Sequence, residues 1–499
     1  MSIGAALVVL LLLMVAANVG AGHTSVDTVN DHFQSYLYQP TKGDLDYEVP
    51  HRREVWNSGR ENVSTEVLCL DLDDNGVKEL VFGTDRGRLV AVEMGTWIEL
   101  VKEKVTDQEI FSLRAGNLDD DEETELVMAA GDGVHCYDMT REKVTWIKPY
   151  ETFDGMVQLV PARTEPGEEE RSDVLFLRMK GTVLAGTEHY VTRLDGEGAE
   201  LYKTQLPEVE GRPALRSSWV VEDMDRDGDL EVFVSDRGKA GIGASGLGKN
   251  IWLVEASNGT VTDTWTIRHA TLASRPMLVV SEGAKSVAVG MDQGLGSADN
   301  NDMLLWDGED HSLRYLDVYD NSDVVSWQHI DFIPDATSGM VVLTSSNWNM
   351  HAFHLVNQDV SWSHQYTLGG LSANPATCDI DGDGDVEVLC PAGGLSFIDA
   401  MTGAVEGRVE PEKGTAINIA LTLADVDDDD VTETVLGHYD TSGVGKYRLE
   451  VLGHIKVPEP EPTANPMWGW ALIIFILVAN VVLFADLWRH WKRPREEED

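Results

Sequence analysis

One acidic stretch, Asp379-Ile380-Asp381-Gly382-Asp383-Gly384-Asp385-Val386-Glu387, constrains the fold more than any other part of this chain. Its carboxylates at positions 1, 3, 5 and 9 are spaced to converge on one hard cation, which takes about six to eight oxygen ligands. Gly384 at position 6 permits the sharp turn that folds the acids inward. An EF-hand loop would instead end in a bidentate glutamate at position 12, between two helices. Here position 12 is Cys390 and the flanks are short apolar or β-branched segments, so the pattern predicts a calcium site on a β-hairpin.

The same loop occurs four more times, and each copy keeps oxygen-bearing side chains at positions 1, 3, 5 and 9. The predicted ligands are Asp71, Asp73, Asn75 and Glu79; Asn117, Asp119, Asp121 and Glu125; Asp223, Asp225, Asp227 and Glu231; Asp379, Asp381, Asp383 and Glu387; and Asp425, Asp427, Asp429 and Glu433. A single Asp-rich run is commonly just a solvated turn. Five copies with one spacing argue against that interpretation and predict Ca²⁺ as the bound ion.

The intervals between the copies indicate the architecture. Loops that begin at residues 71 and 117 are 46 residues apart, and so are those that begin at 379 and 425. The longer intervals, 117 to 223 and 223 to 379, leave room for units whose loops have lost their acids. Three degenerate copies fit there: Arg171–Phe176, Ser286–Gly290, and Ile330–Phe332 with Met340–Leu343. A repeat of about 40–50 residues with four short strands is typical of a propeller blade. We therefore expect an all-β fold, a β-propeller with eight blades favoured and seven possible.

These loops, with Phe82-Gly83 and the turn Cys390-Pro391-Ala392-Gly393, resemble FG-GAP/VCBS repeats over about residues 45–456. The resemblance implies the calcium-bearing β-propeller of integrin α-subunit heads and many microbial surface proteins. That family usually has seven blades, whereas the count of repeats here favours eight. A weaker resemblance is to pyrroloquinoline-quinone-type repeats, whose propellers typically have eight blades. It rests on Val134–Asp138 followed by Trp146, and on Leu395–Gly403.

Both ends of the chain predict export and membrane anchoring. Residues 1–22 hold an unbroken apolar run followed by small residues, which is typical of a secretory signal peptide. No Lys or Arg precedes that run, so an uncleaved signal anchor is the alternative. Residues 467–488 are apolar enough for a transmembrane helix, and the basic run Arg489–Arg495 follows directly. The positive-inside rule then places the propeller outside the cell and the tail, 489–499, in the cytoplasm.

Composition suggests the remaining boundaries. Residues 23–50 are polar and turn-rich and are expected to form an N-terminal strap before the propeller, 51–456. Residues 457–466 begin with alternating Pro and Glu and predict a semi-rigid linker. The segments 164–171, 238–249 and 292–302 are expected to be loop insertions. Arg53–Trp56 resembles a fourth strand with no blade of its own, and the last repeat lacks one. We predict that this strand closes the ring by pairing with the last repeat.

Cysteines and glycosylation sequons leave alternatives open. An exported chain permits disulfides, and Cys378 and Cys390 are the best candidates because they bracket a calcium loop on adjacent strands. Buried thiols are the equal alternative for these two and for Cys69 and Cys136. Two sequons, Asn62-Val63-Ser64 and Asn258-Gly259-Thr260, could carry glycan outside the cell. Sequons also arise by chance, and the sequence does not decide whether these two are glycosylated.

Charge and motifs bound the function. A formal net charge of −48 excludes unassisted binding to nucleic acid as a main role. The expected function is therefore a calcium-binding, membrane-anchored platform for a protein or glycan ligand. We expect no enzymatic activity, because calcium-saturated carboxylates are poor general bases. One alternative is a quinoprotein-like dehydrogenase using the propeller channel, although the vicinal cysteine pair of that family is missing from the sequence. Another alternative is a membrane-bound assembly or scaffold factor.

Overall fold

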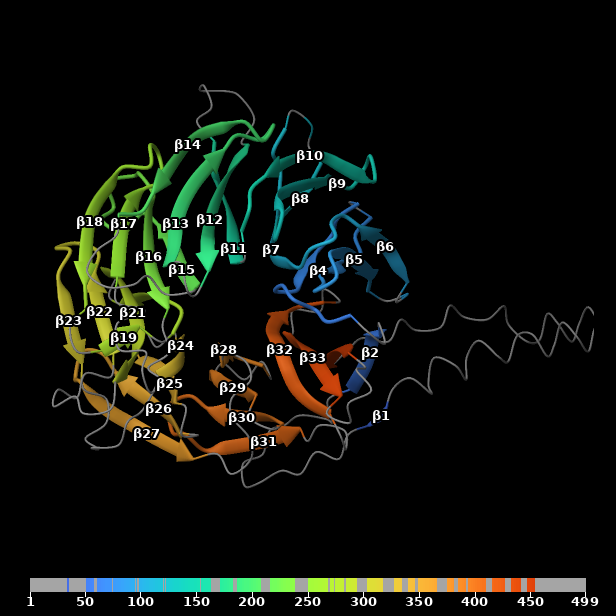
Figure 1. Ribbon diagram of the computed structural model, residues 1–499. Helices are drawn as coiled ribbons and strands as arrows, with labels where there is room; N and C mark the ends of the chain where they lie inside the picture. The colour runs from blue at the N-terminus through green and yellow to red at the C-terminus, as the bar shows by residue number, and fades with distance from the viewer. Residues whose placement is uncertain are drawn as a thin grey trace, which may run out of the picture. The chain divides into compact units, whose positions relative to one another are not determined.

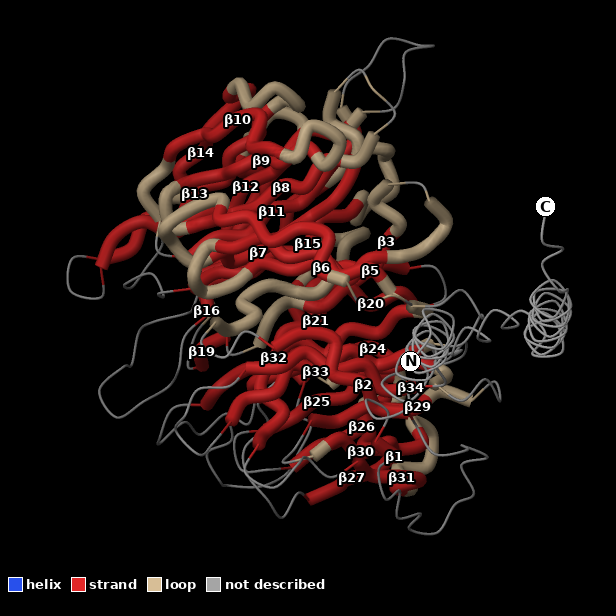
Figure 2. Tube along the Cα trace, turned by 90° about the vertical axis from the view of Figure 1, so that its right-hand side faces the viewer, coloured by secondary structure: helices blue, strands red, loops and turns tan. Residues whose placement is uncertain are grey.

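The computed structural model describes residues 34–35 and 51–453, apart from internal gaps, the longest of which are 163–170, 208–215, 238–249, 294–302, 317–326 and 366–374. The predicted signal peptide, linker, transmembrane helix and tail lie outside the described residues, as do the insertion 238–249 and most of the other two. Within the part of the chain that is described, no helix is long and apolar enough to cross a membrane. Figure 2 shows strands and loops there, without helices.

Eight antiparallel sheets are arranged as blades around a central axis (Figure 1), which confirms eight blades rather than seven. The first four blades are β3 (Leu68–Leu70), β4 (Glu79–Gly83), β5 (Arg88–Glu93) and β6 (Glu99–Lys104); β7 (Ile110–Gly116), β8 (Glu125–Ala130), β9 (Gly133–Asp138) and β10 (Lys143–Pro149); β11 (Asp154–Pro161), β12 (Ser172–Thr182), β13 (Gly186–Leu194) and β14 (Glu200–Gln205); and β15 (Arg216–Glu222), β16 (Glu231–Arg237), β17 (Asn250–Glu255) and β18 (Val261–Thr266).

The other four blades follow the same order, with two additions at their edges. They are β19 (Ala270–Leu272) and β20 (Met277–Ser281), both paired with β21 (Ala284–Gln293), then β22 (Met303–Asp307) and β23 (Leu313–Leu316); β24 (Trp327–Ile333), β25 (Met340–Ser345), β26 (Asn349–His354) and β27 (Asp359–Gln365); β28 (Ala376–Cys378), β29 (Glu387–Pro391), β30 (Leu395–Asp399) and β31 (Val405–Val409); and β32 (Thr415–Ala424), β33 (Glu433–Asp440), β34 (Tyr447–Gly453), β2 (His51–Asn57) and β1 (Gln34–Ser35). The three degenerate copies thus contribute strands to blades three, five and six.

The core of the ring lies between the blades. Among the described residues there are eight clusters of buried apolar side chains, one at each junction of adjacent blades. A second strand such as β4 is buried along its whole length because a neighbouring blade covers each of its faces. The outermost strand β10 alternates between exposed and half-buried residues, as expected for a sheet edge that faces water on one side.

A recurring contact joins the outer strand of one blade to the next blade. An aromatic side chain on the fourth strand donates a hydrogen bond to a carbonyl in the turn that follows the next blade's third strand. The three pairs are Trp146 Nε1 to Gly196 O (2.8 Å), Tyr202 OH to Ala256 O (2.9 Å) and Trp362 Nε1 to Ala400 O (2.7 Å). The same turn places a positive-φ glycine against the aromatic ring; a Cβ on Gly403 would lie 2.6 Å from Trp362. This contact holds the turns after β13, β17 and β30 in fixed positions.

The ring closes by joining the two ends of the propeller, as predicted. Strand β2 pairs antiparallel with β34, with Arg53 opposite Val451 and Trp56 opposite Leu449. Trp56 is 3% exposed and meets Phe82 of the first blade edge-on, with ring centroids 5.0 Å apart. The short strand β1 pairs with β2 in turn. The strap predicted over residues 23–50 therefore contributes one strand, β1, to the last blade. This strand covers the edge of β2 that would otherwise be unpaired.

Of the two alternatives left open for Cys378 and Cys390, the structure has thiols rather than a disulfide, as it does for Cys69 and Cys136. The register of β28 against β29 places Cys378 opposite Glu387. Cys390 lies three residues further along β29, and an odd offset along a strand points a side chain to the other face of the sheet. Cys378 accordingly packs at the junction of blades seven and eight, whereas Cys390 packs at the junction of blades six and seven.

Candidate metal-binding loops

Each of the five acidic loops connects the first strand of its blade to the second. The glutamate at position 9 is the first residue of β4, β8, β16, β29 or β33. It pairs with the residue just before position 1, as Leu70 with Glu79 in the first blade. All five glutamates are buried, with exposures between 0% and 4%. The hairpin register therefore brings position 9 back beside position 1 in every copy.

One hydrogen bond is common to all five loops. The Oε2 atom of the position 9 glutamate accepts the backbone N–H of position 2, from Leu72 (2.8 Å), Leu118 (2.8 Å), Met224 (2.7 Å), Ile380 (2.9 Å) and Val426 (2.8 Å). The side chains of these position 2 residues are buried in the core. The sequence analysis did not identify these position 2 residues. The signal that indicates them is an apolar residue at position 2 of every copy. They anchor each loop.

Carboxylate oxygens converge in the three loops whose aspartates are described. In each cluster the oxygens lie within 4.8 Å of one another, and each cluster could hold a metal ion: Asp71, Asp73 and Glu79; Asp119, Asp121 and Glu125; and Asp223, Asp225 and Glu231. In the other two loops Asp379, Glu387, Asp425 and Glu433 are described, whereas the predicted ligands Asp381, Asp383, Asp427 and Asp429 lie outside the described residues.

The remaining predicted ligands make hydrogen bonds within their own loops. Asn75 Oδ1 accepts the N–H of Val77 (2.7 Å), and Asp227 Oδ1 accepts that of Asp229 (2.9 Å). Asn117 donates from Nδ2 to the carbonyl of Asp121 (2.8 Å), which leaves its Oδ1 as the atom available to a cation. These contacts belong to the tight turns that fold the loop around its centre.

The electrostatics of the clusters are unfavourable without a cation. Burial, with a smaller contribution from the aspartates of the same loop, raises the pKa of Glu79, Glu125 and Glu231 to about 7, against the opposing effect of the backbone hydrogen bond. Among the described residues, Glu79 Oε1 and Asp223 Oδ1 are buried oxygens without a hydrogen-bond partner, as is Asn117 Oδ1. A buried polar atom without a partner is costly, and a bound cation would relieve that cost.

The second loop differs because an arginine lies against it. Arg141 donates to Asp138 (2.6 Å) and also approaches Asp119 (3.6 Å) and Asp121 (3.4 Å). The guanidinium thus contacts two predicted ligands, at positions 3 and 5. In two other loops a lysine contacts a backbone carbonyl: Lys285 Nζ donates to Asp223 O (2.8 Å) and Lys78 Nζ to Asp425 O (2.7 Å). Lys78 Nζ also lies 3.9 Å from Asp425 Oδ2, a predicted ligand at position 1.

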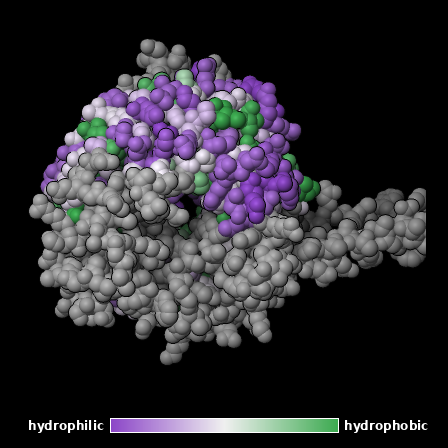
Figure 3. All heavy atoms as spheres, in the orientation of Figure 1, coloured by the Kyte–Doolittle hydropathy of each residue, from purple (hydrophilic) through white to green (hydrophobic). Residues whose placement is uncertain are grey.

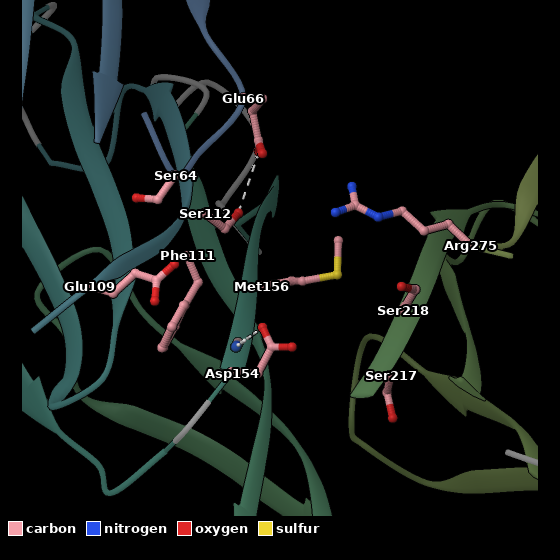
Figure 4. A pocket seen from close by; sticks show the side chains of 11 residues that line it. Ser64, Glu66, Glu109, Phe111, Ser112, Asp154, Met156, Ser217, Ser218 and Arg275 are labelled. Carbon is pink, nitrogen blue, oxygen red and sulfur yellow. Dashed lines mark hydrogen bonds between the residues drawn. The ribbon is translucent and has the colours of Figure 1, made fainter. Parts of the chain in front are cut away.

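A separate polar cavity of about 200 Å³ lies at the other end of the inner strands. It is lined at the starts of β7, β11 and β15, whereas the acidic loops follow the ends of β7 and β15. Figure 4 shows Arg275 and Ser218 on one wall, facing Glu66, Ser112 and Met156 on the other. Ser112 Oγ donates to Glu66 Oε1 (3.4 Å). The cavity contains none of the predicted ligands.

No protein-family model and no curated protein matches the chain. Solved structures do: Sqt1 from Saccharomyces cerevisiae is 11% identical, with a TM-score of 0.53, over 80% of this chain and 98% of that one. The Dos1 propeller is 12% identical, with a TM-score of 0.50, over 84% and 96%. BamB from Moraxella catarrhalis is 13% identical, with a TM-score of 0.47, over 81% and 99%. At such identities the likeness shows the β-propeller fold alone.

Proposed function

We propose that this chain is a calcium-binding, membrane-anchored β-propeller of the FG-GAP/VCBS type, which acts outside the cell as an interaction platform for a protein or glycan. The observation that supports the proposal best is the geometry shared by the loops. A buried glutamate closes five hairpins in the same way, and aspartates converge on it in the three loops where they are described.

Hard cations such as calcium suit these loops better than soft metal ions do. The candidate ligands are carboxylate, amide and backbone oxygens, which hard cations prefer, and no thiol or imidazole belongs to the three clusters. The side chains at positions 1, 3, 5 and 9 would hold the ion. The bound ion would supply the positive charge that keeps these acids together, and its preference for the native state would add to stability. Weak sites of this kind fill where calcium is millimolar, as outside cells.

An interaction platform fits the described surface. The face seen in Figure 3 is mostly hydrophilic where it is described, with small scattered apolar groups. The alternative, a quinoprotein-like dehydrogenase, would use the channel. That family carries a vicinal cysteine pair over its cofactor, and no two cysteines are adjacent in this sequence. We therefore favour binding over catalysis.

Protease added outside intact cells should remove the propeller and leave a membrane-bound C-terminal stub. The expectation rests on the apolar residues 467–488 and the basic run Arg489–Arg495. Blotting with an antibody to the tail measures the stub, and permeabilised cells, in which the tail is also digested, are the control. A full-length chain protected from protease would reverse the topology.

On the same cells, a membrane-impermeant cross-linker should capture a partner when calcium is present. Chelator should abolish this capture, because the proposed platform depends on bound calcium.

Arg141→Gln should raise the calcium affinity of the second loop severalfold. The guanidinium competes with calcium for Asp119 and Asp121, and glutamine removes that competing charge. Calorimetric titration of the detergent-solubilised chain, in the presence and absence of Asp121→Ala, isolates this site. Arg88→Gln is the matched control, because Arg88 pairs with Glu61 (2.9 Å) away from the acidic loops. Equal affinities in the wild type and in Arg141→Gln would show that the arginine does not compete.

A further inference from the structure

The two glycosylation sequons occupy different surroundings in the folded chain. Asn258 is exposed and lies in the turn between β17 and β18. Its Oδ1 accepts the backbone N–H of Thr260 (2.8 Å), so the carbonyl oxygen is bound within the turn. Within the part of the chain that the structure describes, neither Nδ2 of Asn258 nor the hydroxyl of Thr260 has a hydrogen-bond partner. Both groups that the sequon chemistry needs are therefore presented to solvent.

The turn that carries Asn258 is held from below by the third blade. Gly259 has a φ of +74°, and its N–H donates to Glu255 O (2.8 Å). Thr204 Oγ1 on β14 donates to Gly259 O (2.7 Å), and a Cβ on Gly259 would lie 2.5 Å from the ring of Tyr202. Since the middle of the sequon packs inward, the flanking Asn258 and Thr260 are directed outward on a fixed support.

The other sequon is part of the ring itself. Val63, its middle residue, is 2% exposed and forms a bridge with Thr84. The Ser64 hydroxyl donates to the carbonyl of Ile110 in the second blade (2.6 Å). The backbone N–H of Asn62 donates to Asp85 Oδ1 (3.0 Å). A glycosyltransferase could bind this sequon only if the segment first separated from both blades.

We propose that Asn258 is a glycan-attachment site of the folded chain and that Asn62 is not; this rests on the proposed export. In the reaction, Asn258 Nδ2 forms a bond to the anomeric carbon of a lipid-linked oligosaccharide diphosphate. The bond from that carbon to the diphosphate oxygen breaks, the electron pair leaves with the lipid diphosphate, and Nδ2 loses one proton to a base. The carbohydrate would lie beside the third acidic loop, which belongs to the fourth blade, because the N–H of Ala256 in the same turn donates to Leu230 O (2.9 Å).

Glycopeptide mass spectrometry of the full chain, isolated from the membranes of its own host, tests the assignment. The peptide with Asn258 should carry a carbohydrate mass, and the peptide with Asn62 should not. Asn258→Gln and Thr260→Val should lose that mass, whereas Thr260→Ser, which keeps the hydroxyl, should retain it. These variants should leave the calcium-dependent melting temperature unchanged, because none of the predicted calcium ligands is altered.

Two results would overturn the assignment: an unmodified Asn258 peptide, or carbohydrate on Asn62. Protease digestion of intact cells, run in parallel, separates this failure from that of the proposed function. A propeller that is cleaved outside the cell but has a bare Asn258 contradicts the glycan site alone. A protected propeller contradicts the proposed export itself.

Discussion

Replacing Glu79 by Gln is expected to stabilise the chain when calcium is chelated and to destabilise it when calcium is saturating. Glu79 is fully buried; its Oε2 accepts the N–H of Leu72, and its carboxylate lies in the cluster with Asp71 and Asp73. Glutamine has almost the same shape and can still accept that N–H bond. Without a cation and above about pH 7, where Glu79 is charged, the substitution removes one of several like charges gathered at short range, so mutual repulsion falls.

With calcium the sign reverses, because the same carboxylate is then a charged ligand. A site with ligand at about 100 times its dissociation constant adds roughly 2.7 kcal/mol to stability. Most of one such increment should be lost in Glu79→Gln, whereas chelation of the wild type should remove the increments of all the occupied sites. The wild-type melting temperature should therefore fall clearly on chelation and recover in millimolar calcium.

Differential scanning calorimetry of wild type and variant, each with chelator and with calcium, measures both signs. Glu99→Gln is the control, since Glu99 pairs with Lys102 on the exposed strand β6 (2.7 Å) and should respond equally in both conditions. A wild-type melting curve that ignores chelator, with no calcium found by elemental analysis, would reduce the loops to acidic turns. If Glu79→Gln changes the melting temperature in the same direction with chelator and with calcium, Glu79 is not a calcium ligand.

Sequence reasoning predicted the features that depend on local spacing. The ligand pattern of one loop fixes a hairpin, because position 9 must return to position 1, and the hairpin fixes the first two strands of a blade. The interval between loops then gives the size of the blade. The number of blades followed from these intervals and the three degenerate copies. The closure of the ring followed from counting strands at the two ends of the propeller, and the pairing of Trp56 with Leu449 confirms it.

Features that depend on contacts between distant segments could not be predicted in this way. Lys78 reaches the carbonyl of Asp425, 347 residues away in the sequence, and only ring closure brings them together. Arg141 lies over Asp121 because the turn after β9 directs it there. The sequence left the state of the cysteine pair open for a related reason. Cys378 and Cys390 bracket a loop and so lie near each other, but only the register shows that they face opposite sides of the sheet.

Deleting residues 51–57 is expected to abolish the monomeric native propeller. The deletion removes β2, which leaves β34 as an unpaired edge in the last blade. It also removes Trp56 from the cluster that joins the first and last blades, a loss worth about 3–5 kcal/mol for a buried Trp→Ala change alone. An exposed strand edge pairs readily with another chain, so the variant should form oligomers or aggregates.

Size-exclusion chromatography and thermal melting of the detergent-solubilised chain measure both consequences. A deletion of residues 24–33, which spares β1 and β2, is the control and should stay monomeric. A peptide spanning residues 48–60 should restore the monomer of the 51–57 deletion by adding the missing strand, because backbone hydrogen bonds supply affinity in strand addition. A scrambled peptide should not, since it cannot place Trp56 against Phe82. If the deletion variant melts like the wild type and stays monomeric, the ring is held by its eight blade junctions alone, and β2 is only a cover for the edge of β34.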